Sequence, residues 1–188
     1  MKVLQKLQQA NAYGYESSWA LVTAGAELGY FRYSDISDYA VQKIENATDE
    51  QLPAIACLTS HSLTRNEQIG YLVELCELEN SSTWLAKRQW LLIELALLLK
   101  KAEQTLQKTD IEEEDDPRIN EIFYELTRLQ PLLETLRDQE PIWMPEIFGY
   151  GFPNPLAVIV QNFHNWLEKE KHWIENEISI HNKGKSHA

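Results

Sequence analysis

A run of carboxylates, "DIEEEDDP" at residues 110–117, has residue types and spacing that could do chemistry. Six of its first seven side chains are acidic, and a proline follows them. The run lacks the alternating D-x-D-x-D-G spacing of a calcium-binding loop, so calcium binding is a minor alternative. The two main interpretations are a solvated loop that starts a helix and a docking surface for a basic protein.

The start of a helix can use only part of this negative charge. Asp116 fits an N-cap and Pro117 fits the first helical position, and a carboxylate beside the cap gains about 0.5–1 kcal/mol from the helix dipole. The other acidic side chains repel one another, and Glu121 and Glu125 continue the charge as a like-charge i,i+4 pair. The docking interpretation therefore predicts a set of partner-binding residues, which are Asp110, Glu112, Glu113, Glu114, Asp115, Glu121 and Glu125.

A second segment, "EPIWMPEIFGYGFPNP" over residues 140–155, holds four prolines, two glycines and four aromatic residues. This composition predicts an ordered aromatic loop. Trp143 and Phe148 are included as partner-binding residues, because the interface could lie on this loop instead.

Three residues on one predicted helix, His164, Glu168 and His172, have the spacing of four that aligns side chains for metal binding. A metal site in a helix bundle takes its ligands from facing helices, and no second helix offers an E-x-x-H pair. His61 lies beside hydroxyl residues in a predicted loop, which is weak support for a catalytic base. The sequence also lacks a phosphate loop, a dinucleotide-binding turn and a nucleophile elbow. We expect no catalytic residues, no metal and no cofactor, and hence no enzyme.

Four short helices are predicted in the first half of the chain. "SSWALVTAGAELG" follows a serine pair, and "SDISDYAVQKI" has Ser34 or Asp35 as its N-cap. "TDEQ" at 48–51 and "TRNE" at 64–67 both fit a capping box. The apolar series that follow these boxes are Leu52, Ile55, Ala56 and Leu58 in the first, and Ile69, Leu72, Val73 and Cys76 in the second.

Three longer helices are predicted in the second half. Residues 84–106 are apolar on nearly all sides, which indicates a central helix with Trp90 and Leu95 buried. A helix from Pro117 carries an apolar seam, and a last one runs from about residue 155 to Ile180. The predicted fold is all-α, an irregular multi-helix bundle of about seven helices, with a single domain over residues 1–180 and a frayed tail over 181–188.

The chain carries a net charge of −12, and this charge is unevenly distributed. Residues 48–83 carry −5 and residues 110–140 carry −8, with +3 on residues 84–109 between them. Such a surface repels nucleic acid and anionic membranes and favours a cationic partner. The apolar stretch at 90–99 is too short to cross a bilayer, and the first residues lack an apolar signal region. With Cys57 and Cys76 interpreted as reduced core residues, these features predict a cytoplasmic protein.

The segment "WALVTAGAELGYFRYSDISDYAVQKI", followed by "KRQWLLIELALLL", resembles a family of small acidic helical bacterial proteins. That family occurs among the immunity proteins of polymorphic-toxin and contact-dependent growth-inhibition systems. The resemblance covers roughly residues 15–100. It implies a cytoplasmic protein that binds and blocks a cognate toxin domain, and a basic RNA-cleaving toxin would suit the charge of this chain. The alternative is a helical scaffold or regulatory module that binds another cellular protein.

Overall fold

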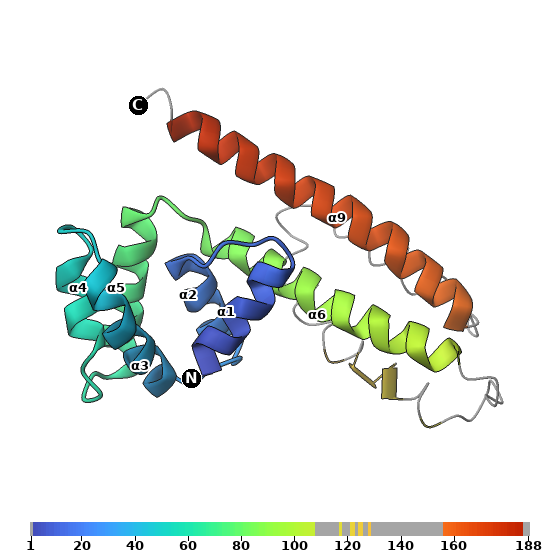
Figure 1. The fold of residues 1–188 in the computed structure, drawn as a ribbon, viewed down its shortest axis with the longest axis horizontal. Helices are drawn as coiled ribbons and strands as arrows, with labels where there is room; N and C mark the ends of the chain where they lie inside the picture. Colours follow the sequence, from blue (N-terminus) through green and yellow to red (C-terminus); the bar gives the residue numbers. More distant parts are fainter. Residues whose placement is uncertain are drawn as a thin grey trace. The chain divides into compact units, whose positions relative to one another are not determined.

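The computed structural model describes residues 2–107 and 156–185, together with Pro117, Glu121, Ile122, Tyr124, Glu125 and Arg128. No strand occurs among these residues, and the all-α prediction is confirmed. The described ranges hold seven α-helices and one short 3-10 helix (Figure 1). They are α1 Lys2–Ala12, α2 Trp19–Glu27, α3 Tyr33–Lys43, η1 Ile44–Asn46, α4 Leu52–Leu58, α5 Arg65–Leu78, α6 Thr83–Leu106 and α9 Leu156–Lys185.

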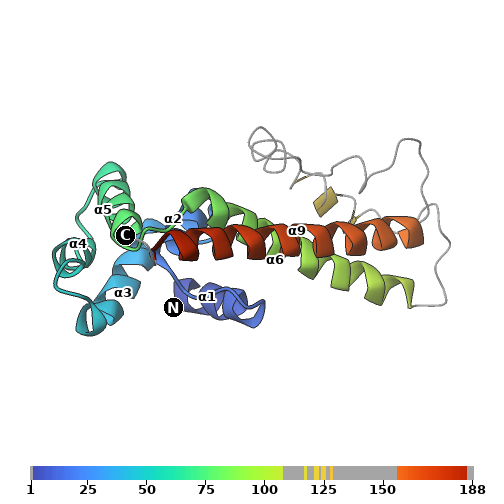
Figure 2. The ribbon, with the colours of Figure 1, turned by 90° about the horizontal axis from the view of Figure 1, so that it is seen from above.

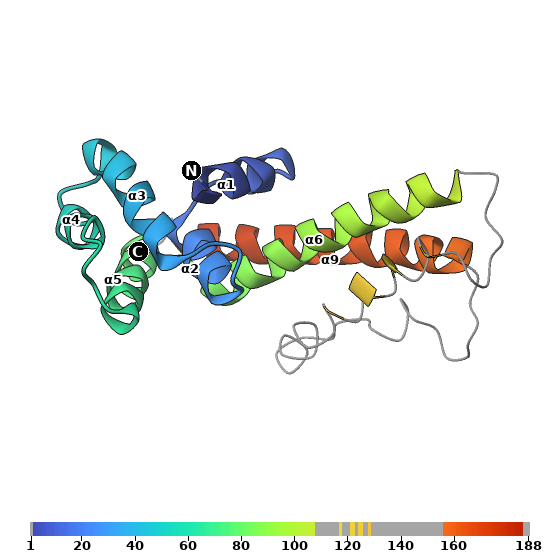
Figure 3. The same ribbon diagram turned by 90° about the horizontal axis from the view of Figure 1, so that it is seen from below.

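The chain divides into two compact units, Met1–Trp90 and Leu91–Ala188. The division falls inside α6, which is one continuous helix of 24 residues (Figures 2 and 3). None of the helices that the structure describes is both long enough and apolar enough to span a membrane.

In the first unit, α5 packs against both α2 and α4, and α3 packs against α1 and α4 (Figure 1). The helix α2 lies in the middle of this core, because eight of its nine residues are buried. Its close packing requires glycine at position 25, where a Cβ atom would lie 2.4 Å from Cζ of Phe31. The first unit therefore forms its core around a helix that is apolar on almost every side.

The first half of α6 closes this core. The indole Nε1 of Trp90 donates a hydrogen bond of 2.9 Å to the carbonyl oxygen of Leu21, and both side chains are fully buried. The ring of Tyr30 meets the Trp90 ring edge-on, with 5.3 Å between the ring centroids. The predicted burial of Trp90 and Leu95 is confirmed, since each is 0% exposed.

The predicted caps are found at the starts of two helices, α2 and α5. Ser18 Oγ accepts a hydrogen bond from the backbone N–H of Leu21 at the start of α2. Thr64 and Glu67 form the predicted capping box of α5, with bonds of 3.3 and 2.8 Å. The bonds of the other predicted box, between Thr48 and Gln51, are present, but α4 begins at Leu52 with Gln51 as its N-cap, three residues after the N-cap Thr48 that the box predicts.

The predicted N-cap of α3 was wrong. The helix begins at Tyr33, so its N-cap is Arg32 and not Ser34 or Asp35. Asp35 still caps the helix, because its carboxylate accepts a 2.9 Å hydrogen bond from the backbone N–H of Arg32. A carboxylate can satisfy the free N–H groups of a helix start from the third helical position as well as from the N-cap.

Only part of the apolar series noted in the sequence of α4 and α5 is buried. Ile55, Leu58, Leu72 and Cys76 are buried as predicted, but Leu52 and Val73 are 41% and 43% exposed. Ala56 and Cys57 are exposed too, so Cys57 is no core residue. The buried side of α5 instead includes a polar residue, Gln68, whose Nε2 donates a 3.2 Å hydrogen bond to Ser37 Oγ of α3.

In the second unit, the described part of α9 buries one side through Val160, Trp166 and Ile174. The helix ends at Lys185 and not near Ile180, so the predicted frayed tail over residues 181–188 is helical as far as Lys185. Ile122 is also fully buried, in keeping with the apolar seam predicted for its helix.

Candidate functional site

Most of the predicted partner-binding residues lie outside the part of the chain that the structure describes. They are Asp110, Glu112, Glu113, Glu114, Asp115, Trp143 and Phe148, and their role stays a prediction.

The other two predicted residues, Glu121 and Glu125, are described, and each forms an ion pair within the second unit. Glu121 Oε1 lies 2.8 Å from Nζ of Lys101, and Glu125 Oε2 lies 2.9 Å from Nε of Arg128. The two carboxylates are thus partly neutralised by cations of the same unit. Exposed pairs of this kind contribute only about 0–1 kcal/mol, so a stronger cationic partner could displace them.

His164, Glu168 and His172 of α9 do not gather as a three-ligand metal site. His164 Nε2 lies 2.6 Å from Glu103 Oε1 on α6, whereas Glu168 and His172 are exposed further along α9. His61 Nε2 lies 3.7 Å from Asp38 Oδ1 at an exposed position. Among the described residues, no three His, Cys, Asp or Glu side chains gather as metal ligands.

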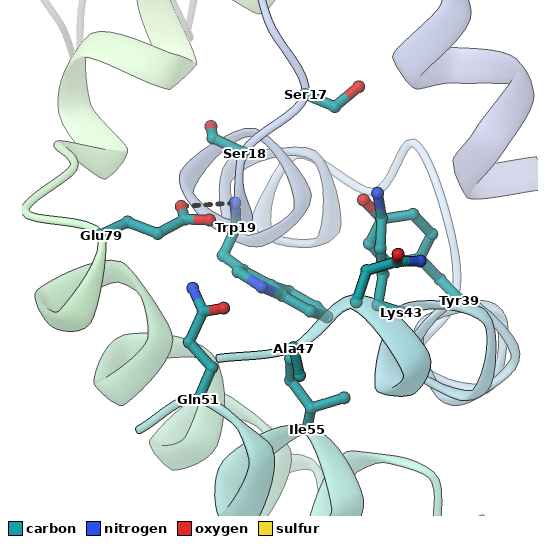
Figure 4. A pocket seen from close by; sticks show the side chains of 10 residues that line it. Ser17, Ser18, Trp19, Tyr39, Lys43, Ala47, Gln51, Ile55 and Glu79 are labelled. Carbon is teal, nitrogen blue, oxygen red and sulfur yellow. Dashed lines mark hydrogen bonds between the residues drawn. The ribbon is translucent and has the colours of Figure 1, made fainter. Parts of the chain in front are cut away.

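A pocket of about 150 Å³ lies between α2, α3, η1 and α4 in the first unit (Figure 4). One of its polar groups is bonded across it: Glu79 Oε2 accepts a 2.8 Å hydrogen bond from the backbone N–H of Trp19 at the start of α2. This carboxylate thereby occupies the helix end that could attract an external anion. The rings of Trp19 and Tyr39 meet edge to face, and the Lys43 ammonium lies 5.3 Å from the Tyr39 ring centroid. Since ligand sites usually measure about 300–1,000 Å³, we interpret this pocket as part of the packing.

The stability of the first unit is expected to fall at alkaline pH because of Tyr39. Burial raises the pKa of the Tyr39 phenol, and the negative charge of Glu79 raises this pKa further. The unfolded chain therefore loses the phenol proton at pH about 10, before the folded chain does. The contribution of Tyr39 to stability is complete below that pH and is lost as the pH rises towards the higher folded-state pKa.

Urea unfolding at pH 8, 10 and 11 measures this effect. The free energy of unfolding of the Tyr39→Phe variant should fall less between pH 8 and pH 11 than that of the unchanged protein. Tyr124→Phe, at a ring that is 69% exposed, is the matched control and should leave the pH dependence unchanged. Identical pH dependence in the Tyr39 variant and the unchanged protein would contradict the assignment.

The exposed side of α5 combines acidic and apolar residues and was not recognised in the sequence. We define the α5 face as Glu67, Gly70, Val73, Glu74, Glu77 and Leu78, all of which are exposed. Val73 and Leu78 are 43% and 41% exposed. Glu74 and Glu77 form no ion pair with a described residue, whereas Glu67 is held by Thr64 in the capping box.

Gly70 lies in the interior of α5, where the fold gives no reason for a glycine. A Cβ atom built there meets no atom within 4 Å, and its backbone has no positive φ. Glycine in a helix interior costs about 0.5–1 kcal/mol relative to alanine. One signal in the sequence pointed to this face: the apolar residues of α5 extend around more of the helix than a buried stripe requires.

The described residues define an all-helical protein whose first unit exposes an acidic and partly apolar helix face. The chain belongs to the family described as "Uncharacterized protein conserved in bacteria (DUF2247)", whose sequence profile matches residues 8–129. No curated protein and no solved structure matches the chain. The family match supports the bacterial origin that the resemblance implied, and it covers the whole of α5.

Proposed function

We propose that the chain is a cytoplasmic immunity protein that binds and occludes a cognate basic nuclease toxin, which cleaves RNA. The observation that carries the proposal is the excess of negative charge that the protein itself does not neutralise. The net charge is −12, and Glu74 and Glu77 of α5 stand exposed without an ion pair among the described residues. The resemblance to bacterial immunity proteins is a second, independent support.

Occlusion of a cationic cleft is the mechanism that fits this charge. A nuclease binds phosphate groups with lysine and arginine side chains, and carboxylates of an inhibitor can occupy the same positions. Opposite charge raises the association rate, because it steers the two proteins together. Exposed apolar residues such as Val73 and Leu78 can then slow dissociation, because they bury apolar surface in the complex.

The proposal predicts a toxin gene next to the gene of this chain, and co-expression with that toxin domain tests the function. Growth should be restored when the chain is present, and the purified pair should form a stable complex in which RNA cleavage is blocked. The control is a toxin domain from an unrelated system, which the chain should not neutralise. A stable complex that still cleaves RNA would contradict the immunity function and favour the scaffold alternative.

Replacement of Glu112, Glu113 and Glu114 by glutamine tests the contribution of the acidic run. We expect a slower association rate with the toxin at 0.1 M salt and little difference at 1 M, since the Debye length falls from about 10 Å to about 3 Å. Stability should change by less than about 0.5 kcal/mol, because Asp116, the N-cap predicted from the sequence, is kept. Stopped-flow kinetics at the two salt concentrations measure the effect. An unchanged association rate at low salt would favour the interpretation of the run as a solvated loop.

A further inference from the structure

We propose that the α5 face is the docking surface for a basic amphipathic helix of the partner protein. The proposal rests on the proposed function, in that the same cationic partner is meant, and it names the face and the kind of element that binds there. It is carried by the arrangement of carboxylates, apolar residues and a glycine on one side of a single helix.

The positions on α5 fit a second helix lying along it. Glu67 lies three residues before Gly70, and Glu74 and Glu77 lie four and seven residues after it. These spacings place the three glutamates on the same side of the helix. Val73 and Leu78 lie on opposite sides of this line and are both exposed. A partner helix with lysine or arginine along one side would place these cations against the glutamates. Apolar residues beside the cations would contact Val73 and Leu78.

Gly70 is the reason to expect a helix, and not a flexible segment, as the element that binds to the α5 face. Two helices pack 8–10 Å apart, and the distance depends on the side chains at the contact. Gly70 lies near the centre of the α5 face and leaves open space above its backbone. A partner helix can therefore approach closely at this point, while Val73 and Leu78 contact its apolar side chains.

The charge of the face selects the occupant. No cation among the described residues neutralises Glu74 or Glu77. An acidic helix would be repelled, and nucleic acid would be repelled as well. A second copy of this chain is disfavoured, because its surface is acidic too. The face therefore suits a cationic helix from a different protein.

The test uses the full chain and a synthetic helical peptide with leucine and lysine at amphipathic spacing; the same peptide with glutamate in place of lysine is the negative probe. Fluorescence anisotropy of the labelled lysine peptide should show binding at 50 mM salt. The double variant Glu74→Gln, Glu77→Gln should bind about threefold to tenfold more weakly, and this difference should shrink at 1 M salt.

Variants of Gly70 separate docking from folding. Gly70→Ala should raise the melting temperature by about 1–4 °C, because alanine favours the helix. Gly70→Gln should keep the helical circular dichroism spectrum but weaken peptide binding about tenfold, because its side chain fills the space for the partner. Ala12→Gln, which adds a side chain to an exposed position of α1, is the matched control and should bind as the unchanged protein does.

Three outcomes would overturn the docking face: no binding of the lysine peptide at millimolar concentration, equal binding of the glutamate peptide, or undiminished binding by Gly70→Gln. Toxin neutralisation distinguishes this failure from failure of the proposed function. If the toxin is neutralised equally well by the Gly70→Gln variant, the function stands and the α5 face is wrong. If the peptide binds at the α5 face but no toxin is neutralised, the face stands and the immunity function is wrong.

Discussion

Replacement of Trp90 by alanine is expected to lower the free energy of unfolding by about 3–5 kcal/mol. Trp90 is 0% exposed, and its indole donates a hydrogen bond to the carbonyl oxygen of Leu21. The substitution removes the apolar volume of the ring and one of the hydrogen bonds that the buried Leu21 carbonyl accepts, and both effects are unfavourable. Urea unfolding followed by circular dichroism measures the loss.

Two further variants make this experiment specific. Trp90→Phe keeps much of the apolar volume but removes the donor, so its loss should be smaller, and it isolates the contribution of the Leu21 bond. Val41→Ala, at a residue 52% exposed on α3, should stay within about 0.5 kcal/mol of the unchanged protein. A loss below about 1 kcal/mol for Trp90→Ala would mean that the first half of α6 does not close the core of the first unit.

The Leu95→Ala substitution is expected to cost about 2–5 kcal/mol. Leu95 is 0% exposed and lies in the part of α6 that belongs to the second unit. A smaller residue leaves a cavity that the close-packed surroundings fill only in part. The same urea unfolding experiment measures the effect.

Ile180→Ala is the control for the second unit, because Ile180 is 63% exposed on α9. Its free energy of unfolding should stay within about 0.5 kcal/mol of that of the unchanged protein. A measured loss below about 1 kcal/mol for Leu95→Ala would make this half of α6 peripheral. The prediction of a central, buried helix would then be wrong, despite its apolar sequence.

Features of the fold that depend on neighbouring residues could be predicted from the sequence. The capping box of Thr64 and Glu67 is an example, because all its hydrogen bonds lie within four residues. The predicted N-cap of α3 was misplaced, because an aspartate can bond the free N–H groups of a helix start from more than one position, and Asp35 does so from the third helical position. Local signals thus located the helices but misplaced the first residues of α3 and α4 by two or three positions.

Several features that depend on distant residues could not be predicted, although the burial of Trp90 and Leu95 could. Gln68 is buried because it bonds Ser37, which lies 31 residues earlier, and Val73 is exposed because α2 and α4 cover other sides of α5. The α5 face was missed because its definition requires knowing which side of the helix is covered. The negative charge of the chain was visible in the sequence, but the pairing of Glu121 with Lys101 was not.

The bond between Trp90 and Leu21 also bears on synthesis of the protein by the ribosome. The donor is made 69 residues after the acceptor, which corresponds to roughly 3–14 s at about 5–20 residues per second. Throughout that interval, α2 lacks the ring that covers it in the finished protein. We expect nascent chains that stop before residue 90 to expose the apolar surface of α2 and to be bound by chaperones until α6 is made.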